Sequence, residues 1–491
     1  MINKTVPTFD LPDPELNFLA TENGLFDYKH LYGFANWFSS ELKSHRIDED
    51  KPLALLSENS EELAFVVGAC FLLQIPFVSL SVKSTDRELR EQIDSVNPSL
   101  YFTDENNLKR IGNSPSISVS KKQLGKTSTQ LSDFSVGKPE LPLGLFFTSG
   151  STGSPKVVPV LRRQILFGAK ASAENFKPEH NRYWLLCLPL NHIGGISIII
   201  RSILYHSAVY LMDRFDPYQV HTFLTENKLF QIASLVPTML TELLDDPLFQ
   251  VHMEFKAILL GGGPISLELI NQSIERGVPI VSSYGMTEAC AQIAANPMLK
   301  PSGVYYPKKS VGRLFPPNKV DVRDPATGKS LPKKEVGLIW LKGPQVFDGY
   351  KDKSLNKSAF DKNGWFNTGD YGHVNRFNQL FIESRRTDRI VTGGENVDPM
   401  EVENALNSLS GIKESAVFGL PDPKWGEKVV ALVVLEDEGL RLNEITSALK
   451  KVLQGYKIPK EIKFVESLPK SSLGKIKRNE LNVLFKNSSS L

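Results

Sequence analysis

Apolar residues in the first hundred positions recur at two alternating spacings. Spacings of three and four residues predict helices over Tyr28–His45 and Glu61–Leu73. Short apolar runs bounded by turn residues predict strands over Pro52–Leu56, Pro76–Leu80 and Ser99–Thr103. Strands that alternate with helices of this length predict a parallel sheet with helical crossovers.

Residues 104–140 lose this periodicity, because Ser, Lys, Asn, Gly and Pro dominate, and we expect mostly loops there. The alternation then returns around an apolar segment, Gly195–Leu204. The expected helices are Arg162–Phe176, Pro217–Asn227, Pro237–Leu244 and Ser266–Arg276. The expected strands are Trp184–Leu188, Ala208–Met212, Gln231–Leu235, Ala257–Leu260 and Val278–Val281. This series predicts a second doubly wound sheet, with ligands at the carboxyl ends of its strands.

The pattern changes twice more toward the C-terminus. From about Gly303 to Ser384, short alternating runs divided by Pro, Gly, Asn and Asp predict an antiparallel, barrel-like part. Beyond Arg385, the expected elements are helices over Pro399–Ser408 and Asn443–Leu453 and strands over Glu414–Gly419 and Lys428–Leu435. The fold class is therefore α/β. A large N-terminal domain, 1–384, holds two doubly wound sheets and the barrel-like part, and a hinge, 385–389, leads to a small α+β domain, 390–491.

Composition narrows the class of protein. The 491 residues carry a formal net charge of +2, which gives no field suited to nucleic acid. Cys70, Cys187 and Cys290 lie far apart, so neither a disulfide framework nor a metal cluster is expected, and a reducing, cytoplasmic location is favoured. No apolar run is long enough to span a bilayer, and the N-terminus has no signal-peptide pattern. We expect a soluble enzyme that acts on small molecules, and a homo-oligomer is left open.

The most informative stretch is Leu145–Lys156, in which an apolar strand end is followed by a Ser/Thr/Gly run and a Lys. Successive backbone N–H groups in such a loop form a concave anion site, and glycines let a ligand approach closely. The stretch differs from the common mononucleotide loop, since no Gly precedes Lys156. It predicts polyphosphate binding, and the alternative is a flexible surface loop.

Other stretches share this chemistry. Ser283–Glu288 follows a predicted strand and offers an aromatic face for a base, a hydroxyl for a phosphate and a carboxylate for Mg²⁺. Asn367–Asp370 places a carboxylate where it could bind two ribose hydroxyls, and Lys475 follows a Gly near the C-terminus. Taken singly, Glu288, Asp370 and Lys475 could each be an ordinary surface residue.

In this order and spacing, the stretches resemble the motifs of the adenylate-forming superfamily of acyl-CoA ligases, adenylation domains and luciferases. The matching residues are Thr148–Lys156, Tyr284–Glu288, Thr368–Asp370, Arg385, Gly393–Asn396 and Lys475. The resemblance covers nearly the whole chain and implies that the C-terminal domain is mobile. Within the superfamily, further stretches resemble the acid–CoA ligases of menaquinone biosynthesis: Pro189–Gly195, Arg201–Ser202, Leu259–Pro264 and Ser283–Gln292.

The resemblance implies two steps, in which a carboxylate and MgATP form an acyl-adenylate and coenzyme A, the co-substrate, then forms a thioester. The catalytic residues it implies are His192, Thr287, Glu288 and Lys475, with Glu288 as the Mg²⁺ ligand. The ATP-binding residues it implies are Thr148, Ser149, Gly150, Ser151, Thr152, Gly153, Lys156, Gly262, Gly263, Pro264, Ser283, Tyr284, Gly285, Met286, Asp370 and Arg385. Gly393 and Gly394 are implied for coenzyme A, and His192, Arg201 and Gly261 for the acid.

The acid pocket leaves alternatives open. Arg201 lies in an apolar segment, where an unpaired charge is costly, so its partner is either a second substrate carboxylate or an internal Asp or Glu. The resemblance implies a gating role for His192, which could instead be a core histidine. Asn191 replaces the family's usual aromatic residue, and Thr387 replaces a frequent hinge Asp.

Three other functions compete with this interpretation. One is an acyl- or aryl-CoA ligase of fatty acid or cinnamate type, and another is an adenylation domain that serves a carrier protein. The third is an acyl-adenylate-binding protein without turnover, which the presence of both Glu288 and Lys475 disfavours.

Overall fold

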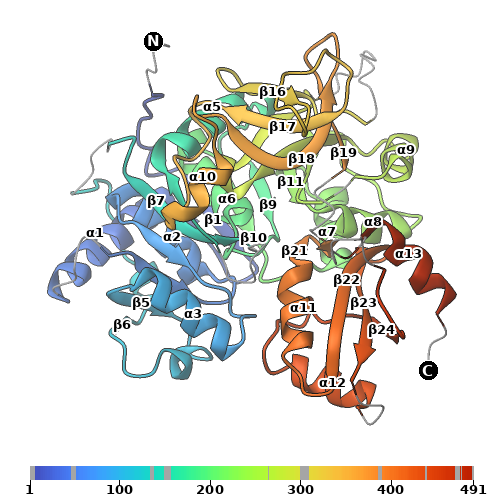
Figure 1. Ribbon diagram of the computed structural model, residues 1–491. Coiled ribbons are helices and arrows are strands. Elements are labelled where there is room, and N and C mark those ends of the chain that lie inside the picture. The colour runs from blue at the N-terminus through green and yellow to red at the C-terminus, as the bar shows by residue number, and fades with distance from the viewer. Residues whose placement is uncertain are drawn as a thin grey trace. The chain divides into compact units, whose positions relative to one another are not determined.

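The computed structural model describes residues 6–45, 51–132, 138–148, 156–263, 265–298, 309–384, 390–436, 440–469, 476 and 478–488. Contacts between residues divide the chain into two compact units (Figure 1). The first unit comprises residues 1–82, 93–147 and 157–383, and the second comprises residues 83–92, 148–156 and 384–491. The expected hinge, 385–389, lies outside the described residues.

A six-stranded sheet contains the strands predicted in the first hundred residues. Its order is β6-β5-β3-β4-β7-β8, and the pairs from β6 through β7 are parallel. The strands are β3 (Leu53–Leu56), β4 (Phe77–Ser79), β5 (Leu100–Thr103), β6 (Ser116–Ile117), β7 (Pro142–Thr148) and β8 (Lys156–Leu161). Helix α1 (Tyr28–Ser44) precedes these strands, and the helices between them are α2 (Glu61–Leu73), α3 (Asp86–Val96) and α4 (Lys121–Leu124). The expected loop region, 104–140, therefore includes β6, α4 and a 3₁₀ turn, Leu108–Ile111.

A nine-stranded sheet contains the second series, in the order β15-β14-β13-β12-β11-β9-β10-β1-β2. Its centre, from β1 through β13, is parallel, and both ends are antiparallel. The central strands are β9 (Tyr183–Leu186), β10 (Ala208–Leu211), β11 (Phe230–Leu235), β12 (Ala257–Leu260) and β13 (Ile280–Met286). The end strands, which the sequence pattern did not predict, are β1 (Asn17–Thr21), β2 (Gly24–Asp27), β14 (Ala291–Ala295) and β15 (Arg313–Leu314).

One apolar core joins the two sheets. Helix α6 (Ile193–Tyr205) packs against α2 and against α5 (Arg162–Phe176). Side chains from strands of both sheets, such as Leu55 and Leu186, belong to the same buried cluster. A second cluster packs α7 (Pro217–Glu226), α8 (Pro237–Asp245) and α9 (Leu267–Glu275) on the nine-stranded sheet. These layers form the doubly wound arrangement that the alternation predicted.

The expected antiparallel part is a four-stranded sheet in the order β16-β17-β18-β19. The strands are β16 (Lys319–Arg323), β17 (Gly337–Lys342), β18 (Phe366–Val374) and β19 (Leu380–Ser384). The short helix α10 (Asn356–Ala359) precedes β18 and follows a 3₁₀ turn, Lys353–Leu355. Strand β18, residues 366–374, belongs to the first unit, and Asp370 within this strand is buried.

The C-terminal part forms the predicted α+β unit. Its sheet pairs β20 (Ile390–Thr392), β21 (Glu395–Val397), β22 (Ile412–Asp422), β23 (Gly426–Leu435) and β24 (Glu461–Phe464). Its helices are α11 (Pro399–Asn407), α12 (Leu442–Leu449) and α13 (Arg478–Asn487). Side chains along β23 alternate, so Val429 and Ala431 share a core with α11 and α12, and Val430 and Leu432 share one with α13.

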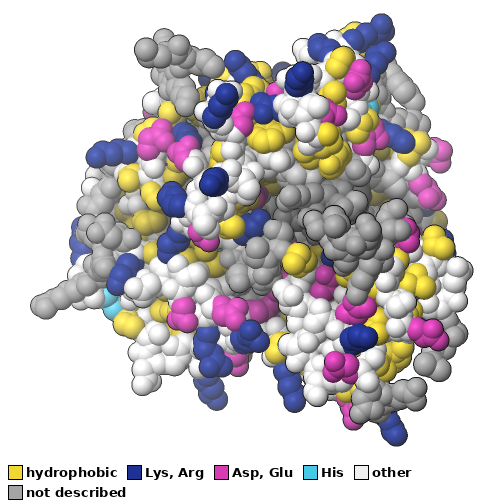
Figure 2. All heavy atoms as spheres, in the orientation of Figure 1, with side chains coloured by type: hydrophobic (Ala, Val, Ile, Leu, Met, Phe, Trp, Pro, Cys, Tyr) yellow, Lys and Arg dark blue, Asp and Glu magenta, His cyan; other side chains and the backbone are white. Residues whose placement is uncertain are grey.

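Acidic and basic side chains are intermixed on the face shown in Figure 2, as the near-zero net charge suggests. Within the described ranges, none of the helices combines the length and apolar character that a membrane crossing requires.

Candidate functional site

The turn after β12 and the carboxyl-terminal half of β13 hold several of the predicted ATP-binding residues. Gly261 donates its N–H to the Leu235 carbonyl at 3.3 Å, and Ser283 donates its hydroxyl to the Leu260 carbonyl at 3.0 Å. Strands β12 and β13 are parallel neighbours, with Leu260 opposite Ser282, so their carboxyl ends lie at the same edge of the sheet. The glycine turn 261–263 and the stretch from Ser283 onward therefore meet there, as the sequence predicted.

Gly285 is required by the close approach of two strands. It lies opposite Gln292, and a Cβ added to it would be 1.7 Å from the Ala291 carbonyl oxygen. Cys290 and Ala291 themselves have positive φ values of 53° and 68°. The turn that follows Thr287 and Glu288 is therefore held in a tight, sparsely populated conformation, of a kind that is common at functional sites.

Tyr284 and Asp370 lie far apart in the sequence and meet in the structure. The Tyr284 hydroxyl donates a hydrogen bond of 2.6 Å to Asp370 Oδ2, and both side chains are buried. The Asp370 N–H donates to the Thr368 hydroxyl at 3.1 Å, and that hydroxyl donates to the Ile339 carbonyl at 2.8 Å. The residues predicted to bind the base and the ribose are thus neighbours with fixed orientations.

Glu288 is held at both its backbone and its side chain. Its carbonyl accepts from the Phe347 N–H at 2.8 Å and from Gln164 Nε2 at 3.3 Å. Its carboxylate oxygen Oε1 accepts from the Tyr350 hydroxyl at 2.9 Å. The side chain is 7% exposed, so the carboxylate is ordered and only slightly open to solvent.

These residues fit a Mg²⁺ ion that arrives with ATP. Glu288 Oε2 accepts no hydrogen bond from the described residues, and the one donor to Oε1 is a neutral hydroxyl. The described part of the chain holds no group of three or more His, Cys, Asp or Glu side chains that could bind a metal. Because Mg²⁺ often takes one or two carboxylates together with substrate phosphates, a single protein carboxylate is adequate.

His192 precedes helix α6 as its N-cap residue and is exposed, so the alternative of a core histidine is wrong. Its Nε2 lies 3.4 Å from Asn191 Nδ2. The preceding turn is fixed by Asn59, whose Oδ1 accepts from the Leu190 N–H at 2.8 Å and whose Nδ2 donates to the Leu188 carbonyl at 3.0 Å. His192 is therefore an accessible side chain on a rigid support.

Arg201 is buried within α6, with 1% of its surface exposed. Its Nε and Nη2 atoms have no hydrogen-bond partner among the described residues. The alternative of an internal Asp or Glu partner therefore finds no support in the described ranges. Arg162 has a similar burial, and its Nε and Nη2 also have no partner among the described residues. It differs from Arg201 because its Nη1 donates to the Phe71 carbonyl at 2.8 Å and its guanidinium lies 4.7 Å from the centre of the Phe71 ring.

The surroundings of Arg201 include other buried polar groups. Burial raises the pKa of the Cys290 thiol to about 12, and the positive charge of Arg201 offsets part of this rise. The same two opposing causes act on Tyr205, whose pKa is also raised to about 12. Arg201 therefore lies near the turn that follows Glu288, although eighty-odd residues separate them in the chain.

Several predicted residues lie outside the described residues and have no structural description: Ser149, Gly150, Ser151, Thr152, Gly153, Pro264, Arg385 and Lys475. Thr148 ends β7 and Lys156 begins β8, on either side of the predicted phosphate loop. The buried Thr148 hydroxyl has no partner within the described part of the chain. Gly393 and Gly394 form the turn between β20 and β21, with φ values of 58° and 82° that favour glycine.

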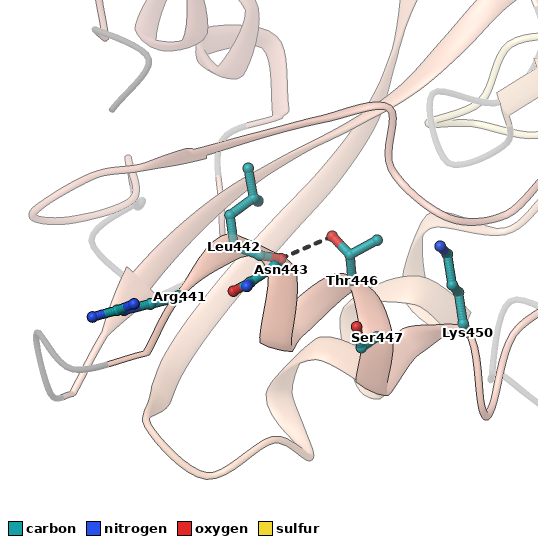
Figure 3. A pocket seen from close by; sticks show the side chains of 6 residues that line it. All are labelled: Arg441, Leu442, Asn443, Thr446, Ser447 and Lys450. Atoms are coloured by element: carbon teal, nitrogen blue, oxygen red, sulfur yellow. Dashed lines mark hydrogen bonds between the residues drawn. The ribbon is translucent and has the colours of Figure 1, made fainter.

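A surface hollow of about 610 Å³ lies beside α12 (Figure 3). Its lining residues are Arg441, Leu442, Asn443, Thr446, Ser447 and Lys450. All belong to one short helix and its ends, and none is a predicted site residue.

Sequence reasoning missed the residues that support the site. Tyr350 and Phe347 hold Glu288, Gln164 assists them, and Asn59 fixes the turn before His192. These residues belong to none of the recognised stretches. A tyrosine or an asparagine at such a position carries no pattern of its own, so only the three-dimensional contacts reveal its role.

The fold and the arrangement of these residues define an adenylate-forming enzyme. The AMP-binding enzyme family model matches residues 13–351, and the model of the AMP-binding enzyme C-terminal domain matches residues 401–475. The chain belongs to this family, as the sequence motifs predicted.

Its relatives include a 2-succinylbenzoate–CoA ligase of Enterococcus faecalis, which is 34% identical over 446 residues, 88% of each chain. Among solved structures, a double mutant of o-succinylbenzoate CoA synthetase from Bacillus subtilis, bound to a product analogue, matches with 31% identity. Its TM-score is 0.88, over 98% of this chain and 97% of that chain. The complex of the same synthetase with ATP and magnesium ion matches with 31% identity and a TM-score of 0.69, over 96% and 97%.

Proposed function

We propose that the chain is an ATP-dependent acid–CoA ligase that converts 2-succinylbenzoate first to its acyl-adenylate and then to its CoA thioester. Family membership and relatives that carry this name over most of their length support the reaction. Relatives bound to ATP with magnesium and to a CoA product analogue support the co-substrates.

The single observation that carries the choice of acid is the buried guanidinium of Arg201. An arginine in an apolar helix whose Nε and Nη2 are unpartnered among the described residues calls for an anion. 2-Succinylbenzoate carries two carboxylates, and after one has reacted the other can bind the guanidinium in a bidentate manner. A fatty acid or a cinnamate brings no second anion, so this observation disfavours both alternatives.

The first step needs cations and oriented donors, because it brings two anions together and builds charge on the α-phosphate. We assign the contact to the α-phosphate to Thr287 and the metal to Glu288. Asp370 and Arg385 bind the ribose, and Tyr284 and the 262–264 turn enclose the adenine. Mg²⁺, when bound, neutralises phosphate charge.

Two further regions complete the step. The loop 149–153 binds the β- and γ-phosphates, and Lys475 bridges the acid carboxylate and the nucleotide oxygens. His192, exposed at the start of α6, controls entry to the acid pocket, and Gly261 lines that pocket.

The second step requires access for a thin pantetheine arm. Two adjacent glycines, Gly393 and Gly394, allow such an arm to approach the backbone closely. Thioester formation requires Lys475 to leave the acyl carbon, and rotation of residues 390–491 about the segment near Thr387 removes it. The N-terminal domain, 1–384, then keeps the adenylate.

The proposal is tested by measuring pyrophosphate release with a panel of acids, with and without coenzyme A. We expect release to depend on the acid and to be fastest with 2-succinylbenzoate, and the thioester to form only with coenzyme A. A clear preference for a fatty or cinnamic acid would replace the proposed substrate. Absence of release with every acid would instead favour an adenylate-binding protein without turnover.

A further inference from the structure

Tyr350 contacts the carboxylate that the proposed function assigns to the metal. Its hydroxyl donates to Glu288 Oε1 at 2.9 Å, and no other hydrogen-bond donor among the described residues reaches that carboxylate. Both side chains are buried, at 6% and 7% exposure. A hydrogen bond to a charged acceptor in such a place contributes more than an exposed one.

The tyrosine is itself firmly held. Its N–H donates to Asn356 Oδ1 at 2.7 Å, and Asn356 Nδ2 donates back to the Tyr350 carbonyl at 3.2 Å. Its ring packs edge-on against Phe347, with 4.9 Å between the ring centres. Phe347 in turn donates its N–H to the Glu288 carbonyl at 2.8 Å. The segment 347–350 thus fixes both ends of Glu288.

The chemistry of the donor matters as much as its position. A phenol donates one neutral O–H, so it orients one carboxylate oxygen and adds no positive charge. A lysine or an arginine would instead bring a positive charge to the carboxylate. Glu288 Oε2 accepts no hydrogen bond from the described residues. The hydrogen bond therefore holds one carboxylate oxygen in a fixed direction and leaves Oε2 without a donor from the described residues, which suits a hard divalent cation.

We propose that Tyr350 is a positioning residue that orients the Glu288 carboxylate for the divalent cation that accompanies ATP. The inference rests on the proposed function, because it takes Glu288 as the metal ligand. Partners of this kind, which orient a ligating group without touching the metal, usually change metal affinity by 10- to 100-fold.

The test is Tyr350→Phe, which keeps the ring and removes only the hydroxyl. The Mg²⁺ concentration that gives half-maximal pyrophosphate release should rise about ten-fold. The rate at saturating Mg²⁺ and ATP should change far less. Calorimetric titration with ATP, in Mg²⁺ and in EDTA, should show that the variant loses most of the tightening that Mg²⁺ gives the wild type. This binding measurement needs neither the acid nor turnover.

Two controls separate positioning from general damage. Tyr284→Phe removes a hydroxyl from Asp370 instead, and it should weaken ATP binding equally with and without Mg²⁺. In a Glu288→Gln background, adding Tyr350→Phe should have no further effect on the Mg²⁺ dependence. If Tyr350→Phe fails to fold, Asn356→Ala, which loosens the tyrosine but keeps its hydroxyl, should shift the Mg²⁺ dependence in the same direction by a smaller factor.

An unchanged Mg²⁺ titration in a folded Tyr350→Phe protein would overturn the inference, and so would a shift that persists in the Glu288→Gln background. A wild type that releases pyrophosphate with none of the acids, yet binds ATP more tightly with Mg²⁺, would reject the proposed turnover but leave Tyr350 testable by calorimetry. A wild type whose ATP binding ignores Mg²⁺ would reject both.

Discussion

Two groups of buried charges in the first unit differ in how completely the protein satisfies them. The carboxylates of Glu288 and Asp370 each accept a hydrogen bond from a tyrosine hydroxyl, at 2.9 and 2.6 Å. Arg201 is more deeply buried than either carboxylate, but its Nε and Nη2 have no partner among the described residues. The protein has therefore arranged its proposed nucleotide-binding groups in advance and has left its proposed acid-binding group incomplete.

The difference has a physical meaning. A preorganised group lowers the barrier without reorganising during the reaction, which suits ATP and Mg²⁺, the ligands common to every turnover. An unsatisfied buried group discriminates, because a ligand that lacks the matching partner leaves it desolvated and unpaired. The hydrogen bonds to Glu288 and Asp370 thus favour nucleotide binding and rate, whereas the unpartnered atoms of Arg201 favour selectivity for the acid.

Apart from the selectivity for the acid, the largest effect is expected at Lys475, which we propose contacts both the acid and the nucleotide. Lys475→Ala should lower acyl-adenylate formation by about 10²–10³-fold or more, since one oriented charge contact to the transition state is lost. Conversion of supplied acyl-adenylate to thioester should persist. Separate assays of the two half-reactions check this, and equal loss of both in a folded protein would remove the assigned role.

The next largest effect is expected for Glu288→Gln, which should weaken Mg²⁺ binding. A neutral amide is a poorer ligand for a hard cation, so the Mg²⁺ concentration for half-maximal pyrophosphate release should rise about 100-fold. Titration of Mg²⁺ at saturating ATP gives the result. A titration that matches the wild type would place the metal elsewhere.

Tyr284→Phe should have a smaller effect, since it removes one hydrogen bond from a carboxylate that remains in place. We expect the Kd for ATP to rise about ten-fold, which corresponds to about 1.4 kcal/mol. The affinity for the acid should not change. Calorimetry with each ligand separates the two, and an unaltered Kd for ATP would show that Asp370 needs no such support.

The last effect is on stability, where Arg201 can be compared with Arg162. Arg201→Leu removes a charge without a hydrogen-bond partner at Nε or Nη2 and should stabilise the unliganded protein, by about 1–4 kcal/mol at most. Arg162→Leu leaves the Phe71 carbonyl without its donor and should lower the Tm. Thermal melts of the two variants provide the check. A larger loss of stability in Arg201→Leu would mean that Arg201 has a structural partner.

The sequence predicted most of the fold because its signals are local. The apolar spacing of residues 61–73 and the Ser60 N-cap specify α2, and the expected and observed bounds agree. The strands β1, β2 and β14 were missed, because five or fewer residues at the end of a sheet carry little periodic signal. Their pairing depends on partners far away in the sequence.

The candidate site also has features that the sequence predicted and features that only the structure shows. Motif residues such as Tyr284 and Asp370 were identified from their stretches, but their mutual hydrogen bond could not be, since 86 positions separate them. The support that Tyr350 gives Glu288 carries no sequence pattern. The burial of Arg201 was foreseeable from its apolar neighbours, whereas the lack of partners at its Nε and Nη2 among the described residues is a finding of the structure.

The most direct test of the proposed role of Arg201 is the selectivity of the wild type and Arg201→Leu for 2-succinylbenzoate against the mono-methyl ester of its second carboxylate. Wild-type kcat/KM should favour the diacid by orders of magnitude, up to about 10⁴–10⁵. Arg201→Leu should lose most of this preference while its Kd for ATP stays close to the wild-type value, and Arg162→Leu should keep it. If Arg201→Leu lowers kcat/KM for the two compounds by the same factor, Arg201 does not bind the second carboxylate and does not select the acid.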